Sequence, residues 1–446
     1  MRSTKSLCAV TLFAACWGLA PLAKALPSYA RQTGLACSGC HTTPPELNAG
    51  GRQFKLMGYV NRVKGNDIIS EASRHNAGLQ LLGALPLSAF LEASLTNTKA
   101  PQGVTQNSNF ELPQDIAIFL AGAWSDHLGS FVQVTYSGQS DSIGIDNTDI
   151  RYANKTQVGG KDLVYGVMLN NNPTLEDLWN STPAWGYPFI SNDSAARPAA
   201  GALINGQLSL GVAGIGAYTM IANHLYAAGT LYRSDHIGNP QPTDGVGQAY
   251  NIRGVAPYWR VAWQQASAKN YLEVGAYGIH AKSTPGGIIG TEDTYTDFGP
   301  DFEYDRILGK DVLSVRGTYI HENAQLDASQ ANAAASPGSH HLNTGNANVE
   351  YHYGNHYSAA IGGFMTQGTN DVLLYPQGNA IFGSANSGPR SAGYIANLSY
   401  WPLQNLDLGV QYTGYTRFNG GSTNYDGLAR NASDNNTVYL LARFLF

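Results

Sequence analysis

The sequence predicts an all-β protein, an antiparallel transmembrane β-barrel of about 16 strands that follows a small N-terminal domain. Charged residues make up only 13% of the 446 residues, whereas glycine (51) and tyrosine (26) are abundant. From residue 79 onward, apolar and polar residues alternate in segments that turn residues separate. The chain ends on such a segment, with an aromatic residue at position 446.

The membrane assignment depends on which residues alternate. The mean hydropathy is −0.21, and beyond the N-terminus no apolar run approaches the ~18 residues of a spanning helix. In "NVEYHYG", Val349 and Tyr351 alternate with Glu350 and His352. Apolar residues outside and polar residues inside are typical of a barrel in outer-membrane lipid, whereas a soluble β-helix or sandwich buries its apolar face.

The connections between the alternating segments are short at one end and long at the other. Turns such as "TQVGG" and "RILGK" are short, and the connection 170–207 is long. Outer-membrane barrels have short periplasmic turns and longer external loops, and an even strand count returns both termini to the periplasm. The predicted strands lie near 79–96, 113–124, 130–138, 145–153, 161–169, 208–219, 223–234, 254–266, 269–281, 294–304, 311–322, 345–354, 356–367, 391–402, 404–416 and 436–446.

A barrel of this size encloses an aqueous lumen. Charged and polar residues at inward positions would line it as solvated wall or as interior salt bridges. These inward candidates are Glu92, Asp149, Arg151, Glu273, Arg316, Glu350, His352, Asp407 and Arg443. Together they would suit a polar plug inside the barrel.

Residues 1–25 have the pattern of an export signal. Arg2 and Lys5 precede the apolar run "LCAVTLFAACWGLAPL", and "AKA" at 23–25 is a small-residue cleavage site. We expect cleavage after Ala25. A lipoprotein acylated at Cys16 is the alternative.

Cys37, Cys40 and His41 form a CxxCH motif, and removal of the signal leaves the chain no other cysteine. In a c-type haem, two thiols bond to the porphyrin vinyl groups and the adjacent histidine binds the iron. The motif therefore predicts one covalent haem c with His41 as the proximal ligand of the haem iron. A disulfide or a zinc site is the alternative.

The sixth ligand of the haem iron has several candidates. Met57 is the only methionine of the N-terminal segment, and its thioether would raise the reduction potential relative to a second imidazole. His75 competes with it, and an open position is the third case. Phe54, Leu56 and Met57 could also simply pack on the haem face.

Residues 26–76, the predicted haem domain, are too few for a comfortable core of their own. They include six basic and three acidic residues, although the whole chain has a formal net charge of −5. A cationic domain thus precedes an anionic barrel over residues 77–446. Charge attraction would lodge the domain in the lumen from the periplasmic side, where a haem would shorten the path of electrons across an apolar belt ~25 Å tall.

Residues 26–59, "LPSYARQTGLACSGCHTTPPELNAGGRQFKLMGY", resemble the fused monohaem cytochrome–porins. The best-known members of that family are outer-membrane iron oxidases of iron-oxidising bacteria. The likeness covers the aromatic-Ala-Arg-x-x-Gly lead-in, the haem motif, the Thr-x-Pro-x-Leu-Asn follow-on and the closing Phe-Lys-x-x-Gly-Tyr. It extends more loosely to "NNNPTLEDLWNSTPAWGYPF" at 170–189 and to the barrel length.

The resemblance implies a protein that accepts electrons from extracellular Fe(II) and passes them to a periplasmic cytochrome, as an Fe(II)–cytochrome c oxidoreductase would. By the same resemblance, Cys37 and Cys40 hold the haem c and His41 is its proximal ligand. Two alternatives stay open. One is a haem conduit for another donor or for outward electron transfer, and the other is a diffusion porin with a structural haem.

Other functional patterns in the sequence are weak. The net negative charge gives no support for nucleic-acid binding, and no glycine-rich phosphate loop stands between a strand and a helix. His340 and His341 form an adjacent pair in a predicted loop, which is poor support for a metal site. The predicted loop acids Glu292, Asp293 and Asp297 would gather Fe(II) or simply be solvated.

Overall fold

The computed structural model describes residues 26–61, 82–101, 107–184, 186, 189, 194–209, 211–234, 250–285, 290–378 and 383–446. The predicted export signal and His75 lie outside the described residues. Within the described chain, seventeen strands form one antiparallel sheet. The sheet closes into a barrel because β1 (Leu87–Thr98) pairs with both β2 (Asn109–Ala123) and β17 (Thr437–Leu445).

Two of these strands are parts of one. β8 (Tyr250–Ile252) and β9 (Ala256–Ala266) pair in succession with β10 (Asn270–Pro285). The interruption at 253–255 separates two stretches of a single barrel strand, so sixteen strands close the barrel described here. The predicted fold class, an antiparallel barrel of about 16 strands, is confirmed.

Every predicted strand overlaps an observed one, although some boundaries differ. β1 begins at Leu87 rather than near 79. The hairpins β10–β11 and β12–β13 extend into predicted loops, because backbone pairing continues there. The other strands are β3 (Leu128–Ser137), β4 (Ser142–Val158), β5 (Lys161–Asn170), β6 (Val212–Ile221), β7 (Leu225–Ser234), β11 (Asp293–Leu308), β12 (Asp311–Leu326), β13 (Ser339–Tyr353), β14 (Tyr357–Gly368), β15 (Ser391–Leu403) and β16 (Leu406–Arg417).

The longer hairpins correct two loop predictions. His340 belongs to β13, is buried and lies 2.7 Å from an oxygen of Asp371, so it does not stand on a free loop. Asp293 and Asp297 belong to β11 and are buried. These acids therefore do not form a solvated surface that could gather cations.

The two faces of the wall differ as the alternation predicts. On β13, Val349 and Tyr351 are 42% and 40% exposed, whereas Glu350 and His352 are 3% and 0% exposed. Eight of the nine inward candidates are buried, and Arg443 is half-buried beside Glu92. An apolar outside around a polar inside is the arrangement of a membrane β-barrel.

Helices are few and short. The N-terminal part has α2 (Pro27–Thr33), the 3-10 turn η2 (Cys37–Gly39) and α3 (Ala49–Leu56). The others are η3 (Leu203–Gln207), α5 (Asp327–Ala331) and η4 (Ala432–Asn435). Among the described residues, no helix is long and apolar enough to cross a membrane.

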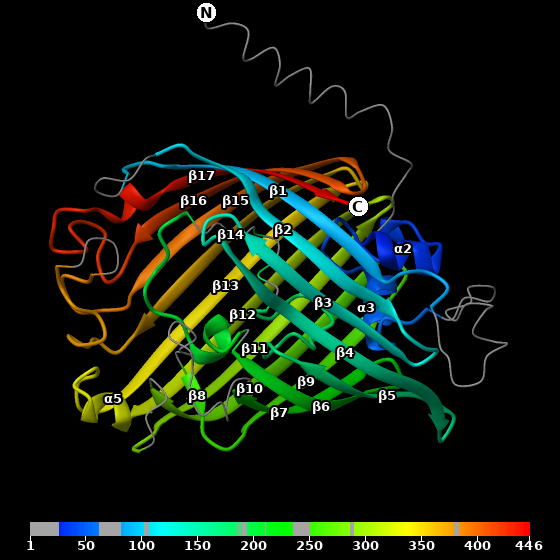
Figure 1. Cartoon of the computed structure of the whole chain (residues 1–446), viewed down its shortest axis with the longest axis horizontal. Coiled ribbons are helices and arrows are strands. Elements are labelled where there is room, and N and C mark those ends of the chain that lie inside the picture. The colour runs from blue at the N-terminus through cyan, green and yellow to red at the C-terminus, as the bar shows by residue number, and fades with distance from the viewer. Residues whose placement is uncertain are drawn as a thin grey trace, which may run out of the picture.

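Residues 26–61, here called the N-terminal segment, lie at the end of the barrel where the C-terminus also lies (Figure 1). The wall holds the segment from different sides. Tyr59 Oη donates to Asp149 Oδ2 on β4 at 2.6 Å, and Arg52 pairs with Glu303 on β11 at 2.9 Å. Because β4 and β11 belong to different parts of the wall, the segment fills the lumen between them.

Residues 171–184, here called the lumen loop, follow β5 and also fold inward. Leu175 and Trp179 are fully buried. Lys55 Nζ of the N-terminal segment donates to the carbonyl oxygens of Leu175 at 2.7 Å and Asp177 at 2.8 Å. The long connection predicted here as an external loop therefore packs against the segment inside the barrel.

Candidate functional site

The CxxCH motif forms one tight turn. His41 N–H donates to Cys37 O at 2.8 Å, and Cys40 N–H donates to the same oxygen at 3.0 Å. Cys37 is buried, Cys40 is half-buried, and neither is in a disulfide. Burial raises the pKa of the Cys40 thiol to about 11, so this sulfur is protonated at neutral pH.

Helix α3 packs directly on this turn. A Cβ atom at Gly51 would lie 2.1 Å from Cys40 O, and one at Gly50 would lie 2.2 Å from Gly39 O. Only glycine permits such a close approach of two backbones. Asn48 begins the helix, because its side chain accepts the N–H groups of Gly50 and Gly51. The motif is therefore held by backbone contacts rather than by flexible side chains.

The His41 ring is oriented by a backbone carbonyl. His41 Nδ1 lies 3.2 Å from Glu46 O. Burial lowers the pKa of His41 below its usual value, which favours the neutral imidazole. With Nδ1–H donating to the carbonyl, Nε2 keeps its lone pair, which is how metal-binding histidines are commonly oriented.

The two thiols and His41 border one cavity of about 340 Å³ between the N-terminal segment and the wall. This volume falls within the ~300–1,000 Å³ of small-molecule and cofactor sites. Charged groups at its border are Lys55 and Arg443 and the carboxylates Glu92, Asp115 and Asp407. Aromatic side chains line it from both sides: Tyr29, Phe54 and Tyr59 of the segment, and Phe90, Phe119 and Phe131 of β1, β2 and β3.

These residues fit a c-type haem. Two thiols at the required spacing and an imidazole with an available Nε2 face the same apolar space. The three residues predicted to hold a haem are therefore brought together.

Met57 lies elsewhere. It is half-buried and packs against an apolar cluster that includes Leu56, Val164 and Met168, and it does not border the cavity. The structure thus joins His41 to the thiols but does not bring Met57 to them. A role for Met57 as sixth ligand stays a prediction that this packing does not support.

The opposite side of the segment is charged. Arg316 on β12 pairs with Glu46 of the segment and with Glu303 at 3.2 Å and Glu350 at 3.4 Å. Arg52 of the segment lies 2.7 Å from Asp305. Although burial alone would raise the pKa of Glu46, the Arg316 guanidinium holds it well below its usual value. This buried network anchors the segment to β11–β13.

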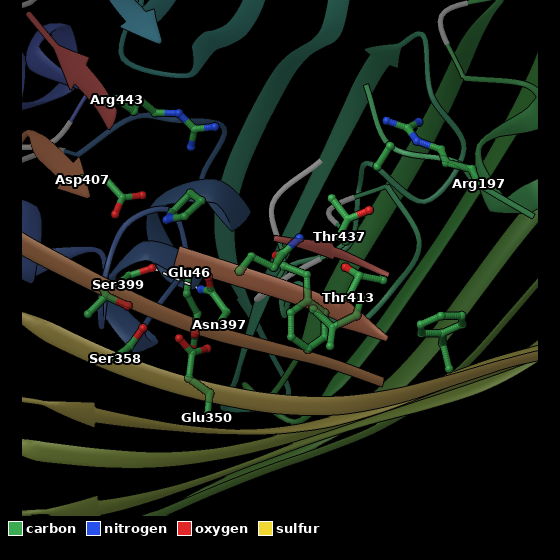
Figure 2. Close-up of a pocket in the computed structure, with 18 of the residues that line it drawn as sticks. Glu46, Arg197, Glu350, Ser358, Asn397, Ser399, Asp407, Thr413, Thr437 and Arg443 are labelled. Carbon is green, nitrogen blue, oxygen red and sulfur yellow. Dashed lines mark hydrogen bonds between the residues drawn. The ribbon is translucent and has the colours of Figure 1, made fainter. Parts of the chain in front are cut away.

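A second, larger cavity of about 630 Å³ adjoins the first, since Trp401, Asp407 and Arg443 border both. Its residues extend from Asp407, near the short β15–β16 turn, to Thr413, nearer the long loop after β16 (Figure 2). We call it the lumen cavity. It leads from the thiol–histidine cavity toward the end of the barrel with the long loops.

Several site residues could not be found from the sequence. Nothing in the local pattern distinguishes Glu46 and Arg52 from solvated charges, because their partners are far away in the chain. The apolar Leu175 and Trp179 in a long connection were the one local sign that the lumen loop turns inward.

No protein-family model matches the sequence, and neither does any curated protein. Solved porin structures resemble the barrel. The outer-membrane channel DcaP of Acinetobacter baumannii is 12% identical, with 81% of this chain and 96% of that chain covered and a TM-score of 0.45. OmpT of Vibrio cholerae, expressed in the outer membrane, is 10% identical, with 81% and 98% covered and a TM-score of 0.44. OmpF of Salmonella typhi in complex with daunomycin is 10% identical, with 81% and 98% covered and a TM-score of 0.39.

The closed sheet, the apolar exterior and the polar lumen are those of a porin-like outer-membrane β-barrel. Its particular feature is the N-terminal segment, which places two thiols and a histidine on one cavity inside the barrel.

Proposed function

We propose that this protein is an outer-membrane electron-transfer protein with one covalent haem c, of the fused monohaem cytochrome–porin type. One observation carries the proposal. Cys37, Cys40 and His41 border a single apolar cavity, and that cavity lies within the barrel. A porin that only conducts solutes has no need of such a set.

In this proposal Cys37 and Cys40 would hold the haem through thioether bonds, and His41 Nε2 would be its iron ligand. The bound haem would supply one-electron transfer. Tyr29, Phe54 and the phenylalanines of β1–β3 would exclude water from the cavity, and a drier surrounding influences the reduction potential. Glu46 O would fix the His41 ring through Nδ1.

The proposed direction is inward, from extracellular Fe(II) to a periplasmic cytochrome. The lumen cavity supports a route between the haem site and the long-loop end, because it adjoins the thiol–histidine cavity and extends toward that end. The N-terminal segment lies at the short-turn end, which is the periplasmic end in barrels of this type.

The test is anaerobic mixing of the full-length, haem-loaded protein in detergent with Fe(II), followed by visible absorbance. We expect rapid appearance of the α-band of a reduced c-type haem. Reduction by dithionite but not by Fe(II) would contradict iron as donor and favour another donor or the outward route. No α-band with either reductant would contradict the haem itself.

The second candidate is a diffusion porin whose haem is structural, and the size of the lumen cavity favours it. Conductance in planar bilayers separates the two functions. A diffusion porin should conduct like other barrels of its strand number, whereas a lumen filled by the N-terminal segment and the lumen loop should conduct poorly.

A further inference from the structure

A second set of metal-ligand residues lies where the N-terminal segment meets the wall. Glu46 of the segment and Glu350 and His352 of β13 each offer one ligand atom, and these atoms lie within 4.8 Å of one another. His352 Nε2 is 3.3 Å from Glu46 Oε2 and 3.6 Å from Glu350 Oε2. Ligands at ~2.0–2.2 Å from one ion stand roughly 3.0–3.6 Å apart, so these two spacings suit a shared ion.

The imidazole of His352 is oriented to bind a metal ion. Its Nδ1 lies 3.0 Å from Thr43 Oγ1, which fixes the ring as an outer partner fixes a metal-binding histidine. His352 is fully buried, and its Nε2 has no hydrogen-bond partner although it faces the two carboxylates. A buried nitrogen directed at two carboxylate oxygens without hydrogen-bond geometry indicates that a cation belongs between them.

The charges of the surrounding network also favour a bound cation. Four buried carboxylates meet two arginines here, Arg52 and Arg316; the carboxylates are Glu46, Glu303, Asp305 and Glu350. With His352 neutral, two negative charges remain without a cation within this described cluster. Buried charges are costly unless they are paired or bind a metal. A divalent ion would compensate both, whereas protons on His352 and a carboxylate are the alternative.

From these observations we infer that Glu46, Glu350 and His352 bind one divalent transition-metal ion of the Mn(II) or Fe(II) kind. Mixed carboxylate and imidazole ligands suit these ions. Glu46 and Glu350 border the lumen cavity, where Figure 2 shows them together at one end, so an ion can reach them from the lumen.

Glu46 connects this metal site to the thiol–histidine cavity. The side chain of Glu46 belongs to the metal set, and its carbonyl oxygen faces His41 Nδ1. On the proposed function, on which this one step rests, the bound ion is the donor. Fe(II) would lose one electron and become Fe(III), and ferric haem iron would gain that electron.

The first experiment titrates the full-length, haem-loaded protein with Mn(II) and follows the loss of the free Mn(II) EPR signal. We expect about one tight site per chain, and Glu350→Gln or His352→Asn should weaken it about tenfold or more. Glu273→Gln is the matched control. Glu273 is also a buried wall carboxylate that pairs with an arginine, at 3.2 Å from Arg260, but it lies outside the set.

Equal Mn(II) affinity of the wild type and Glu350→Gln would overturn the site and favour protons in its place. The wild type alone provides a second test in case the variants do not fold. Bound Mn(II) should speed the relaxation of the ferric haem EPR signal, whereas diamagnetic Zn(II) should not. Mn(II) binding without this effect would place the ion elsewhere and also overturn the inference.

The two proposals can fail separately. If Mn(II) binds at this site but Fe(II) does not reduce the haem, the metal site is retained and the proposed function is contradicted. Haem reduction by Fe(II) in a protein without the Mn(II) site would do the reverse.

Discussion

The N-terminal segment meets the barrel through two unlike faces. Toward β1–β3 it turns the thiols, Tyr29 and Phe54 to an apolar cavity. Toward β11–β13 it turns Glu46 and Arg52 to buried charges. The apolar face borders the thiol–histidine cavity, whereas the charged face forms buried ion pairs with the wall. Since buried ion pairs often contribute more to specificity than to stability, the charged face would decide where the segment sits and the apolar face what it holds.

The largest effect should come from removing the thiols. Cys37→Ser with Cys40→Ser should abolish covalent haem, because no sulfur remains to form a thioether bond. Haem-dependent peroxidase staining of a denaturing gel measures this. The charged face is untouched, so the barrel should still show heat-modifiable migration. Covalent haem in this variant would contradict the role of the apolar face.

The next largest effect should come from Arg316→Met. It leaves Glu46, Glu303 and Glu350 buried without their shared arginine, and breaking such a buried pair costs ~3–5 kcal/mol. The measurement is the urea midpoint for proteolytic release of the segment. Arg306→Met is the control, because Arg306 donates to the amide oxygen of Asn270, and it should change the midpoint little.

A smaller loss should follow from Tyr59→Phe. It removes the hydroxyl that donates to buried Asp149 at 2.6 Å. Arg151 still pairs with this carboxylate, so the expected cost is that of one hydrogen bond to a charged group, ~1.5–3 kcal/mol. Tyr29→Phe is the comparison, because Tyr29 Oη donates to the backbone oxygen of Ser130. Thermal melts should rank the two variants in this order, and the reverse order would contradict the charge-assisted bond at Tyr59.

A pH effect should accompany these losses, as a minimum of segment stability near neutral pH. Burial raises the pKa of Glu176 to about 7, so the folded state keeps this proton to a higher pH than the unfolded state does. Stability therefore falls as the pH rises from about 4.5 to 7. Burial lowers the pKa of Lys55 to about 7, so stability rises with pH between about 7 and 10.5.

The urea midpoint at a series of pH values measures both limbs. Glu176→Gln should flatten the acidic limb alone, and Lys55→Met should flatten the alkaline limb alone. A variant that flattens both limbs would indicate that the two groups do not titrate separately.

Much of the fold was predictable because the strands follow from the local alternation of apolar and polar residues. Alternation with a period of two residues places Val349 outside and Glu350 inside whatever the rest of the chain does. Strand ends were less predictable, since β10–β13 continue wherever a partner backbone is available. The position of Asp293 on β11 was mistaken for this reason.

Only the haem-attachment motif of the candidate site was predictable from the sequence. The spacing of Cys37, Cys40 and His41 indicates haem attachment without any knowledge of the fold. The neighbours of these residues were not predictable. Met57 is near the motif in the chain yet packs in another cluster, whereas Phe90 and Arg443 are distant in the chain and border the cavity.

The sequence by itself determined the strands, their two faces and the thiol–histidine turn, because each depends on residues a few positions apart. Only the tertiary structure decided which strands hold the segment, that the lumen loop turns inward, and that Glu46 meets Arg316 and His352. Arg316 is 270 positions from Glu46, and His352 is 309 positions from Thr43. Such pairs form only when the sheet closes, because closure alone brings the inner faces of distant strands around one segment.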